Sequence, residues 1–295
     1  MNEHIVDSPY VLTADIGGSH ITAAICHAGT LRIIPESISR AAVNSKATRS
    51  DIFNSWQKAL ISSRDSAQVA IAGLAVAMPG PFDYQNGISL ITGLNKYEAI
   101  YQQDIKSALA GLLDMESKHV LFRNDAEATV AGEALLGAGA GYGRVAGITL
   151  GTGFGSAFHS HTLTTDLNYG SYPYGESIAD EYFSTRWFTK RYAELSGNSI
   201  KDVKTLAENV PTDHVARQVF DEFANNLAEF LKRYLPELAP DILVLCGSIS
   251  KAAAYFLPHL RSSLPELTIQ TSQLGEEAAL IGAAELFTYT KTVNT

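Results

Sequence analysis

The chain has 295 residues, of which 46% are hydrophobic, and it carries 31 acidic against 22 basic residues. This length is enough to bury a sizeable core, and we expect two lobes. The net charge of −9 argues against nucleic acid or an anionic membrane as a partner, whereas backbone amides and Mg²⁺ can hold a small phosphate ligand without a basic surface.

The two cysteines, Cys26 and Cys246, each lie within an apolar run. We interpret them as buried free thiols in a reducing cytosol. The N-terminal residues MNEHIVDSPY lack the basic and apolar regions of a signal peptide, and no apolar run approaches the ~20 residues of a membrane-spanning helix. These features predict a soluble, cytoplasmic protein.

The first half of the chain predicts a β-meander followed by alternating helices and strands. Alternating apolar runs predict strands in VLTADI, ITAAICH and LRIIPESI, all within residues 11–38. A helix near 50–64, an apolar strand ending on Pro-Gly-Pro at 79–81 and a helix near 101–113 follow. HVLFRN then predicts a strand, and a polar break separates it from a helix in AEATVAGEALLGAG.

The strand, glycine tip and strand pattern begins again near residue 145, in RVAGITLGTGFGSAFHSH. The two hairpins, ADIGGSHITAA and ITLGTGFGSAF, form a weak internal repeat. The remaining pattern predicts a long amphipathic helix over 213–235, a strand in DILVLCG, and helices near 250–262 and 276–289.

The two glycine tips are the first candidate site. An ordinary hairpin turn explains each tip alone, because such turns need glycine where φ is positive. Together, Gly17-Gly18 and Gly151-Thr152-Gly153 could hold a polyphosphate from two sides through backbone N–H groups and hydroxyls. Asp15 would then contact Mg²⁺ through water, because Mg²⁺ keeps much of its hydration shell.

Neither tip matches a better-known phosphate loop. No Gly-Lys-Ser/Thr follows either one, which excludes a Walker A loop, and the glycines of GAGAGYG at 137–143 have the wrong frame for a dinucleotide fingerprint. That stretch reads as a helix C-terminal cap and loop.

Asn124-Asp125 is the second candidate site, because the pair lies where an apolar strand gives way to a helix. Asn and Asp are favoured helix N-caps, which is one interpretation. The other is that a carboxylate at a strand end acts as the general base for a substrate hydroxyl.

Six segments of the chain, in this order, resemble the ROK family of bacterial sugar kinases and sugar-responsive repressors: DIGGSHITAA, AMPGPFD, NDAEATVAGEALLGAG, TLGTGFGSAF, LCGSIS and LGEEAALIGAAEL. The resemblance implies the two-lobed actin/hexokinase-like (ribonuclease-H-like) α/β fold, with the active site in the interdomain cleft. We expect an N-terminal α/β lobe from residues 1–122 with 277–295, and a C-terminal α/β lobe from 123–276.

The resemblance also implies roles for single residues. Asp125 would be the catalytic base, and Asp15 the Mg²⁺ contact. The residues expected to bind ATP and its phosphates are Asp15, Gly17, Gly18, Ser19, Thr22, Gly151, Thr152, Gly153, Gly247, Ser248 and Gly275. Those expected to bind sugar are Asn95, Asn124, Asp125, Glu176 and Asp180, with Glu181 as a rival for the place of Asp180.

One segment departs from the family pattern. ROK proteins usually carry a Gly-Glu-x-Gly-His segment followed by a cysteine cluster that binds zinc, but residues 159–184 contain no cysteine. We therefore expect no structural zinc, with this segment held by packing of its tyrosines. His159 and His161 are expected on the exposed end of the second hairpin.

These features predict an ATP- and Mg²⁺-dependent kinase that phosphorylates a hexose hydroxyl, glucokinase-like, most simply at the 6-hydroxyl. An N-acetylated amino sugar or fructose kinase is an alternative, and a non-catalytic sugar-sensing protein of the same fold is another. The phosphate hairpin starts at residue 11, so a preceding DNA-binding domain of the repressor type is not expected. The partners expected are a sugar, ATP and, from the family, a second copy in a homodimer.

Overall fold

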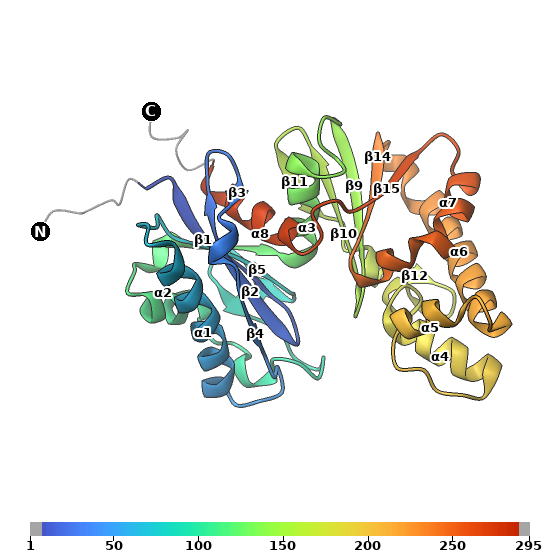
Figure 1. The fold of residues 1–295 in the computed structure, drawn as a ribbon, viewed down its shortest axis with the longest axis horizontal. Helices are drawn as coiled ribbons and strands as arrows, with labels where there is room; N and C mark the ends of the chain where they lie inside the picture. Colours follow the sequence, from blue (N-terminus) through green and yellow to red (C-terminus); the bar gives the residue numbers. More distant parts are fainter. Residues whose placement is uncertain (1–7, 289–295) are drawn as a thin grey trace, which may run out of the picture. The chain divides into compact units, whose positions relative to one another are not determined.

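The computed structural model describes residues 8–288. The chain divides into two compact units: unit 1 comprises the residues up to Gly132 together with those from Glu276 on, and unit 2 is Glu133–Gly275. The first division falls within helix α3 (Asp125–Leu136), at Gly132 rather than at residue 122. Figure 1 shows the elements of each unit along the chain.

The sheet of unit 1 has the order β3-β2-β1-β5-β8, with β4 also paired to β2. Strands β1 and β2 are antiparallel, whereas β1, β5 and β8 are parallel neighbours. The carboxyl ends of these three strands therefore lie at the same edge of the sheet. The strands are β1 (Tyr10–Ile16), β2 (His20–His27), β3 (Arg32–Ile33), β4 (Ser39–Ala42), β5 (Leu74–Met78) and β8 (Val120–Asn124).

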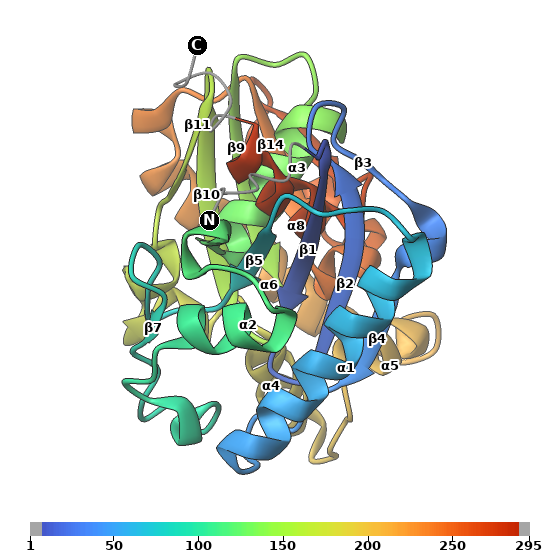
Figure 2. The ribbon, with the colours of Figure 1, turned by 90° about the vertical axis from the view of Figure 1, so that its left-hand side faces the viewer.

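Helices cover both faces of this sheet (Figure 2). Alternate residues of β1 point to opposite faces. Leu12 packs with α1 (Arg49–Ala67) and α2 (Ile105–Leu113), and Val11 belongs to the opposite cluster of small residues from α3 and α8 (Glu277–Ala284). The helix expected near 276–289 is thus α8 followed by the 3-10 helix η8 (Glu285–Phe287), and residue 289 lies outside the described residues.

The predicted third strand, residues 31–38, is wrong beyond its first residues. β3 ends at Ile33, and a 3-10 helix, η1 (Pro35–Ser37), begins at the proline. Proline has no backbone N–H for the sheet and a fixed φ that suits the start of a helix. The Ser37 hydroxyl accepts the Ile25 N–H at 2.7 Å, so a side chain takes a hydrogen bond that a strand would have supplied.

The sheet of unit 2 has the order β11-β10-β9-β14-β15, again an antiparallel hairpin beside parallel strands. This agreement in layout confirms the repeat expected from the two hairpins. The strands are β9 (Arg144–Leu150), β10 (Phe154–Ser160), β11 (Leu163–Asp166), β14 (Ile242–Cys246) and β15 (Thr268–Thr271). The helices are α4 (Thr185–Ser196), α5 (Val203–Asn209), α6 (His214–Tyr234), η7 (Ser248–Tyr255) and α7 (Leu257–Ser263).

Short elements complete both units. Unit 1 has the two-residue strands β6 (Phe82–Asp83) and β7 (Ile88–Ser89), and unit 2 has β12 (Pro173–Tyr174) and β13 (Ser177–Ile178). Both cysteines are free and buried, as expected, and burial raises the pKa of Cys26 to about 12. Within residues 8–288, the structure contains no helix both long and apolar enough to cross a membrane.

Candidate active site

Two carboxylates stand at the carboxyl edge of the unit 1 sheet. Asp15 lies near the end of β1, and Asp125 follows β8 directly, at the start of α3. β5 runs between them, with Ala77 paired to Asp15 on one side and to Arg123 on the other. Neighbouring strands are about 4.8 Å apart, so this register places Asp15 and Arg123 about 10 Å apart, and Asp125 follows two residues later at the same edge of the sheet.

Asp15 is held in surroundings that disfavour its charge. Burial is the main cause that raises its pKa to about 7, and the charges of Asp125 and Glu276 add to the shift, while Arg40 opposes it. Arg40 is itself paired with Glu276 at 2.6 Å. A divalent cation near Asp15 would relieve this excess of negative charge, so the donor set fits Mg²⁺.

We predict that this carboxyl makes the metal-free protein less stable as the pH rises. The unfolded Asp15 loses its proton near 3.8 and the folded one near 7, so between these values the folded state binds a proton that the unfolded state has released. The free energy of unfolding therefore falls as the pH rises through this window. Urea unfolding in EDTA, measured from pH 5 to 8, should show the wild type losing stability relative to Asp15→Asn as the pH rises. If the free energy of unfolding of the two proteins changed in parallel with pH, the raised pKa would not belong to Asp15.

The first tip does not need glycine for its backbone. Neither Gly17 nor Gly18 is among the residues with positive φ, so of the two explanations for this tip the ordinary glycine turn does not hold. A Cβ added at Gly18 would meet nothing within 4 Å. The missing side chain therefore leaves room for something outside the chain, which favours a close-approaching ligand over an ordinary turn.

The tip has two backbone N–H groups that make no hydrogen bond within the described residues, while the carbonyls of Gly17 and Ser19 are both bonded. Gly17 donates its N–H to the His20 carbonyl at 2.9 Å, and its own carbonyl accepts the Tyr97 hydroxyl at 2.5 Å. Among the described residues, no hydrogen bond uses the N–H of Gly18 or Ser19, both of which are exposed. Thr22 is buried on β2, opposite Asp15.

The second tip, in unit 2, shows the same arrangement. The Gly151 carbonyl accepts the Thr185 N–H at 2.8 Å, and the Thr152 carbonyl accepts the Arg186 guanidinium at 3.1 Å. Within residues 8–288, the N–H groups of Thr152 and Gly153 take part in no hydrogen bond. Two successive N–H groups with their carbonyls turned away form a suitable anion-binding concavity.

The predicted segment that contains Gly247 and Ser248 lies beside this tip. A Cβ at Gly151 would lie 3.6 Å from the Ser248 hydroxyl. Gly247 has a φ of 85°, and a Cβ there would lie 2.4 Å from the Leu150 carbonyl, so this position requires glycine. Gly275, the last predicted nucleotide residue, has a φ of 58°.

Asn124 is the N-cap of α3. Its side-chain oxygen accepts the N–H groups of Ala126 at 2.9 Å and Glu127 at 3.1 Å, and its amide nitrogen donates to the Tyr84 hydroxyl at 3.1 Å. The capping interpretation therefore holds for Asn124 and fixes the start of the helix that carries Asp125. A role toward sugar stays a prediction for both residues.

The three acidic residues of unit 2 that were candidates for sugar binding lie either at the second tip or on the surface. Asp180 accepts the Phe154 N–H at 2.6 Å and forms an ion pair with Arg186 at 2.6 Å. These two contacts stabilise the second tip. Glu181 also pairs with Arg186, at 3.0 Å, and is exposed. Glu176 is exposed beside β13 and donates its backbone N–H to the Tyr182 hydroxyl at 3.2 Å.

Arg186 was not predicted, although a local signal exists. A cation in the first turn of a helix opposes the helix dipole, so it points to an acidic partner nearby. Glu133 was missed too: its fully buried carboxylate accepts the Ser272 hydroxyl at 2.5 Å and the Leu274 N–H at 2.9 Å, which fixes the segment before Gly275. The signal in the sequence was a Glu within the apolar part of α3, because a buried acid needs hydrogen-bond partners.

The segment around the second hairpin differs from expectation at His159. Its pairing with Thr164 across β10 and β11 places it on the covered side, where it is 5% exposed and its Nδ1 lies 2.9 Å from the Thr164 hydroxyl. The expected exposed position is therefore wrong. His161 is exposed, but it lies in the turn beyond β10 with a φ of 60°, so the two side chains do not share a strand face.

Aromatic packing holds the following segment, as expected. Tyr172 contacts Tyr169 and Tyr234 with ring centroids 5.0 and 5.1 Å apart, and Tyr174 packs 5.2 Å from Phe183. These contacts join the segment to α6 and to the core of unit 2. Such edge-to-face aromatic contacts order the segment within unit 2.

We predict that the protein contains no stoichiometric zinc. Among residues 8–288, no three His, Cys, Asp or Glu side chains are arranged to hold a metal ion. Elemental analysis of protein purified without a metal-binding tag should give far less than one zinc per chain, with thermal stability unchanged by a chelator. A zinc ion retained through dialysis and needed for stability would contradict this prediction.

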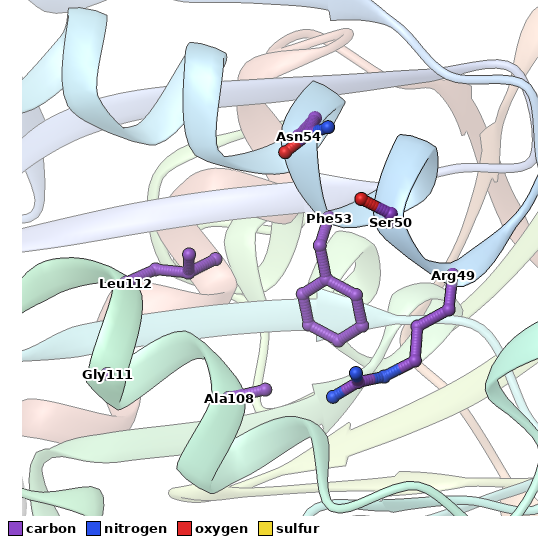
Figure 3. A pocket seen from close by; sticks show the side chains of 7 residues that line it. All are labelled: Arg49, Ser50, Phe53, Asn54, Ala108, Gly111 and Leu112. Carbon is purple, nitrogen blue, oxygen red and sulfur yellow. The ribbon is translucent and has the colours of Figure 1, made fainter.

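Two hollows among the described residues each lie within a single unit. One, of about 350 Å³, is lined by α1 and α2, with Arg49 stacked over the Phe53 ring and Leu112 opposite (Figure 3). The other, of about 550 Å³, lies in unit 2 and includes Glu176 and Trp187. The α1–α2 hollow contains none of the predicted site residues.

A family model described as "ROK family" matches residues 11–164 and 176–290. The chain belongs to the ROK family. The gap in the match falls within the segment that lacks the family's cysteines. This ROK protein is 24% identical to an N-acetyl-D-glucosamine kinase of Mannheimia succiniciproducens, over 92% of the chain and 97% of the relative. It is 23% identical to a glucokinase of Thermotoga maritima, over 81% and 85%.

Solved structures establish the fold of this ROK protein. A ROK family glucokinase from Streptomyces griseus, in complex with glucose and AMPPNP, matches with a TM-score of 0.78 and 21% identity, covering 94% of this chain and 98% of that one. A ROK hexokinase from Thermus thermophilus matches with a TM-score of 0.75 and 20% identity, covering 97% and 100%. The two-lobed actin/hexokinase-like α/β fold expected from the motifs is thereby confirmed.

Proposed function

We propose that this ROK protein is an ATP-dependent sugar kinase that transfers a phosphoryl group to a hexose hydroxyl, most simply the 6-hydroxyl of glucose. The observation that carries the proposal is the first tip. A side chain at Gly18 would meet nothing within 4 Å, and the Gly18 N–H makes no hydrogen bond among the described residues. The tip follows Asp15 at the carboxyl edge of the sheet, where β8 also leads into Asp125. Kinase relatives over most of the chain support the same activity.

The chemistry asks for placement and charge stabilisation more than for covalent catalysis. The N–H groups of the two tips would bind phosphate oxygens, and Asp15 would hold Mg²⁺ through water. When bound, the ion neutralises charge on the phosphates. Asp125 would accept the proton of the attacking sugar hydroxyl, while Asn95, Asn124, Glu176 and Asp180 would orient the sugar.

An N-acetylated amino sugar is the second candidate acceptor. The relatives with the longest matches include N-acetyl-D-glucosamine kinases of Mannheimia succiniciproducens and Histophilus somni, at 24% and 22% identity over 92% of the chain. The match to the family breaks at residues 165–175, next to Glu176, so this part of the sugar site is the least comparable with relatives.

The deciding experiment measures sugar-dependent release of ADP. Wild-type protein with MgATP would be tested against glucose, mannose, fructose, N-acetylglucosamine and N-acetylmannosamine, with Asp125→Asn as the blank. We expect glucose or an N-acetylated amino sugar to be turned over well above the blank. Tight sugar binding by calorimetry without any turnover would instead favour the non-catalytic sugar-sensing alternative.

A further inference from the structure

Tyr97 joins two parts of unit 1 that the proposed function assigns to different substrates. It lies two residues after Asn95, in the segment expected to bind sugar, and its side chain is fully buried. Its hydroxyl donates to the Gly17 carbonyl at 2.5 Å, in the first phosphate tip. Burial, with a smaller contribution from Asp15, raises the pKa of Tyr97, so the hydroxyl keeps the proton that it donates.

The segment around Tyr97 has an unusual backbone that other contacts hold in place. Gly93, Asn95 and Tyr97 have φ values of 70°, 55° and 57°. A left-handed conformation is uncommon for a bulky residue and persists only where the surroundings enforce it. Here the Tyr97 N–H donates to the Ser45 carbonyl at 2.7 Å, and the ring packs 5.7 Å from that of Trp56.

The hydroxyl acts on the tip through the geometry of one peptide bond. In a planar trans peptide, the carbonyl of one residue and the N–H of the next point in opposite directions. Holding the Gly17 carbonyl toward the buried Tyr97 therefore turns the Gly18 N–H outward, where Gly18 leaves open space. With this peptide reversed, the tip would present a carbonyl oxygen, which repels a phosphate.

We propose that Tyr97 is a positioning residue that fixes the Gly17–Gly18 peptide in the orientation that binds phosphate. The inference rests on the proposed function, because it assumes that the tip holds the phosphates of ATP. It adds a part that the segment motifs do not reveal: a tyrosine of the sugar segment sets the electrostatics of the phosphate tip.

The test is Tyr97→Phe, which removes the hydroxyl and keeps the buried ring. We expect a non-hydrolysable ATP analogue with Mg²⁺ to bind about threefold to tenfold more weakly, as for loss of one hydrogen bond. Adenosine, which has no phosphate, should bind as it does to wild type. KM for ATP should rise by a similar factor, while KM for the sugar stays within about twofold.

Tyr169→Phe is the matched control, because it removes a tyrosine hydroxyl that donates to the Tyr234 carbonyl at 3.0 Å in unit 2. Equal analogue affinity in wild type and Tyr97→Phe would overturn the inference, as would an equal loss of affinity for adenosine and analogue. A purely structural role would lower the melting temperature and leave KM for ATP unchanged. If wild type binds the analogue but turns over no sugar, the proposed function fails while this test still decides the role of Tyr97.

Discussion

The Asp125→Asn variant is expected to turn over about 10²–10⁴-fold more slowly than wild type, because a positioned general base contributes about that much. The fold should survive, since Asn124 caps α3 and the amide oxygen of the variant can still accept the Ala126 N–H that Asp125 accepts at 2.8 Å. The measurement is single-turnover phosphoryl transfer with saturating sugar and MgATP, together with calorimetric binding of an ATP analogue. Analogue binding should stay near the wild-type value.

Asp114→Asn is a suitable control for this substitution. Asp114 is exposed at the end of α2 with a φ of 56°, a conformation that Asn also adopts readily, so its activity should equal that of wild type. If Asp125→Asn keeps more than about a tenth of the wild-type rate when chemistry limits turnover, Asp125 is not the base.

The Gly18→Val variant should lose at least about tenfold in affinity for ATP, because a β-branched side chain would occupy the space that the phosphate needs. Folding should change little, since the backbone at Gly18 is not left-handed and the space around its Cβ is open. Calorimetry with MgATP and, separately, with the sugar would measure the effect. Sugar affinity should stay the same.

Gly111→Val gives the matched control for Gly18→Val. A Cβ at Gly111 also meets nothing within 4 Å, but this glycine lies on α2, away from the sheet edge. Its variant should bind ATP like wild type. Unchanged ATP affinity in a folded Gly18→Val protein would leave the first tip without a role in phosphate binding.

Local pattern was enough to predict most helices and strands. The apolar stripe of α6 and the apolar run of β14 agree with the structure. A helix buried on one face has apolar residues at helical spacing, and a strand buried on both faces is apolar throughout, so each pattern can be read from the sequence. The third strand failed for a local reason, since Pro35 removes a backbone donor. The two hairpins that carry the glycine tips were predicted from their short motifs, although the first tip does not have the positive φ that an ordinary glycine turn needs.

The contacts that orient the candidate site were beyond such reasoning. Tyr97 and Gly17 are 80 residues apart, and Glu133 and Leu274 are 141 apart. A hydrogen bond between such partners leaves no periodic trace in a single sequence, because only the completed fold brings them together. The burial of His159 was missed for a similar reason. It depends on the pairing of β10 with β11, and no local sequence pattern predicts that pairing.

Helix α8 has a consequence for the order in which the chain can fold during synthesis. The Thr13 hydroxyl donates to the Leu280 carbonyl at 2.7 Å, and Arg123 bonds the Gly282 carbonyl at 2.8 Å and Glu285 at 2.6 Å. A ribosome that has delivered residues up to Gly132 has therefore delivered a sheet whose second face has part of α3 but still lacks α8. Unit 2 is continuous in sequence and can close first, so the part of the chain made earliest is finished last.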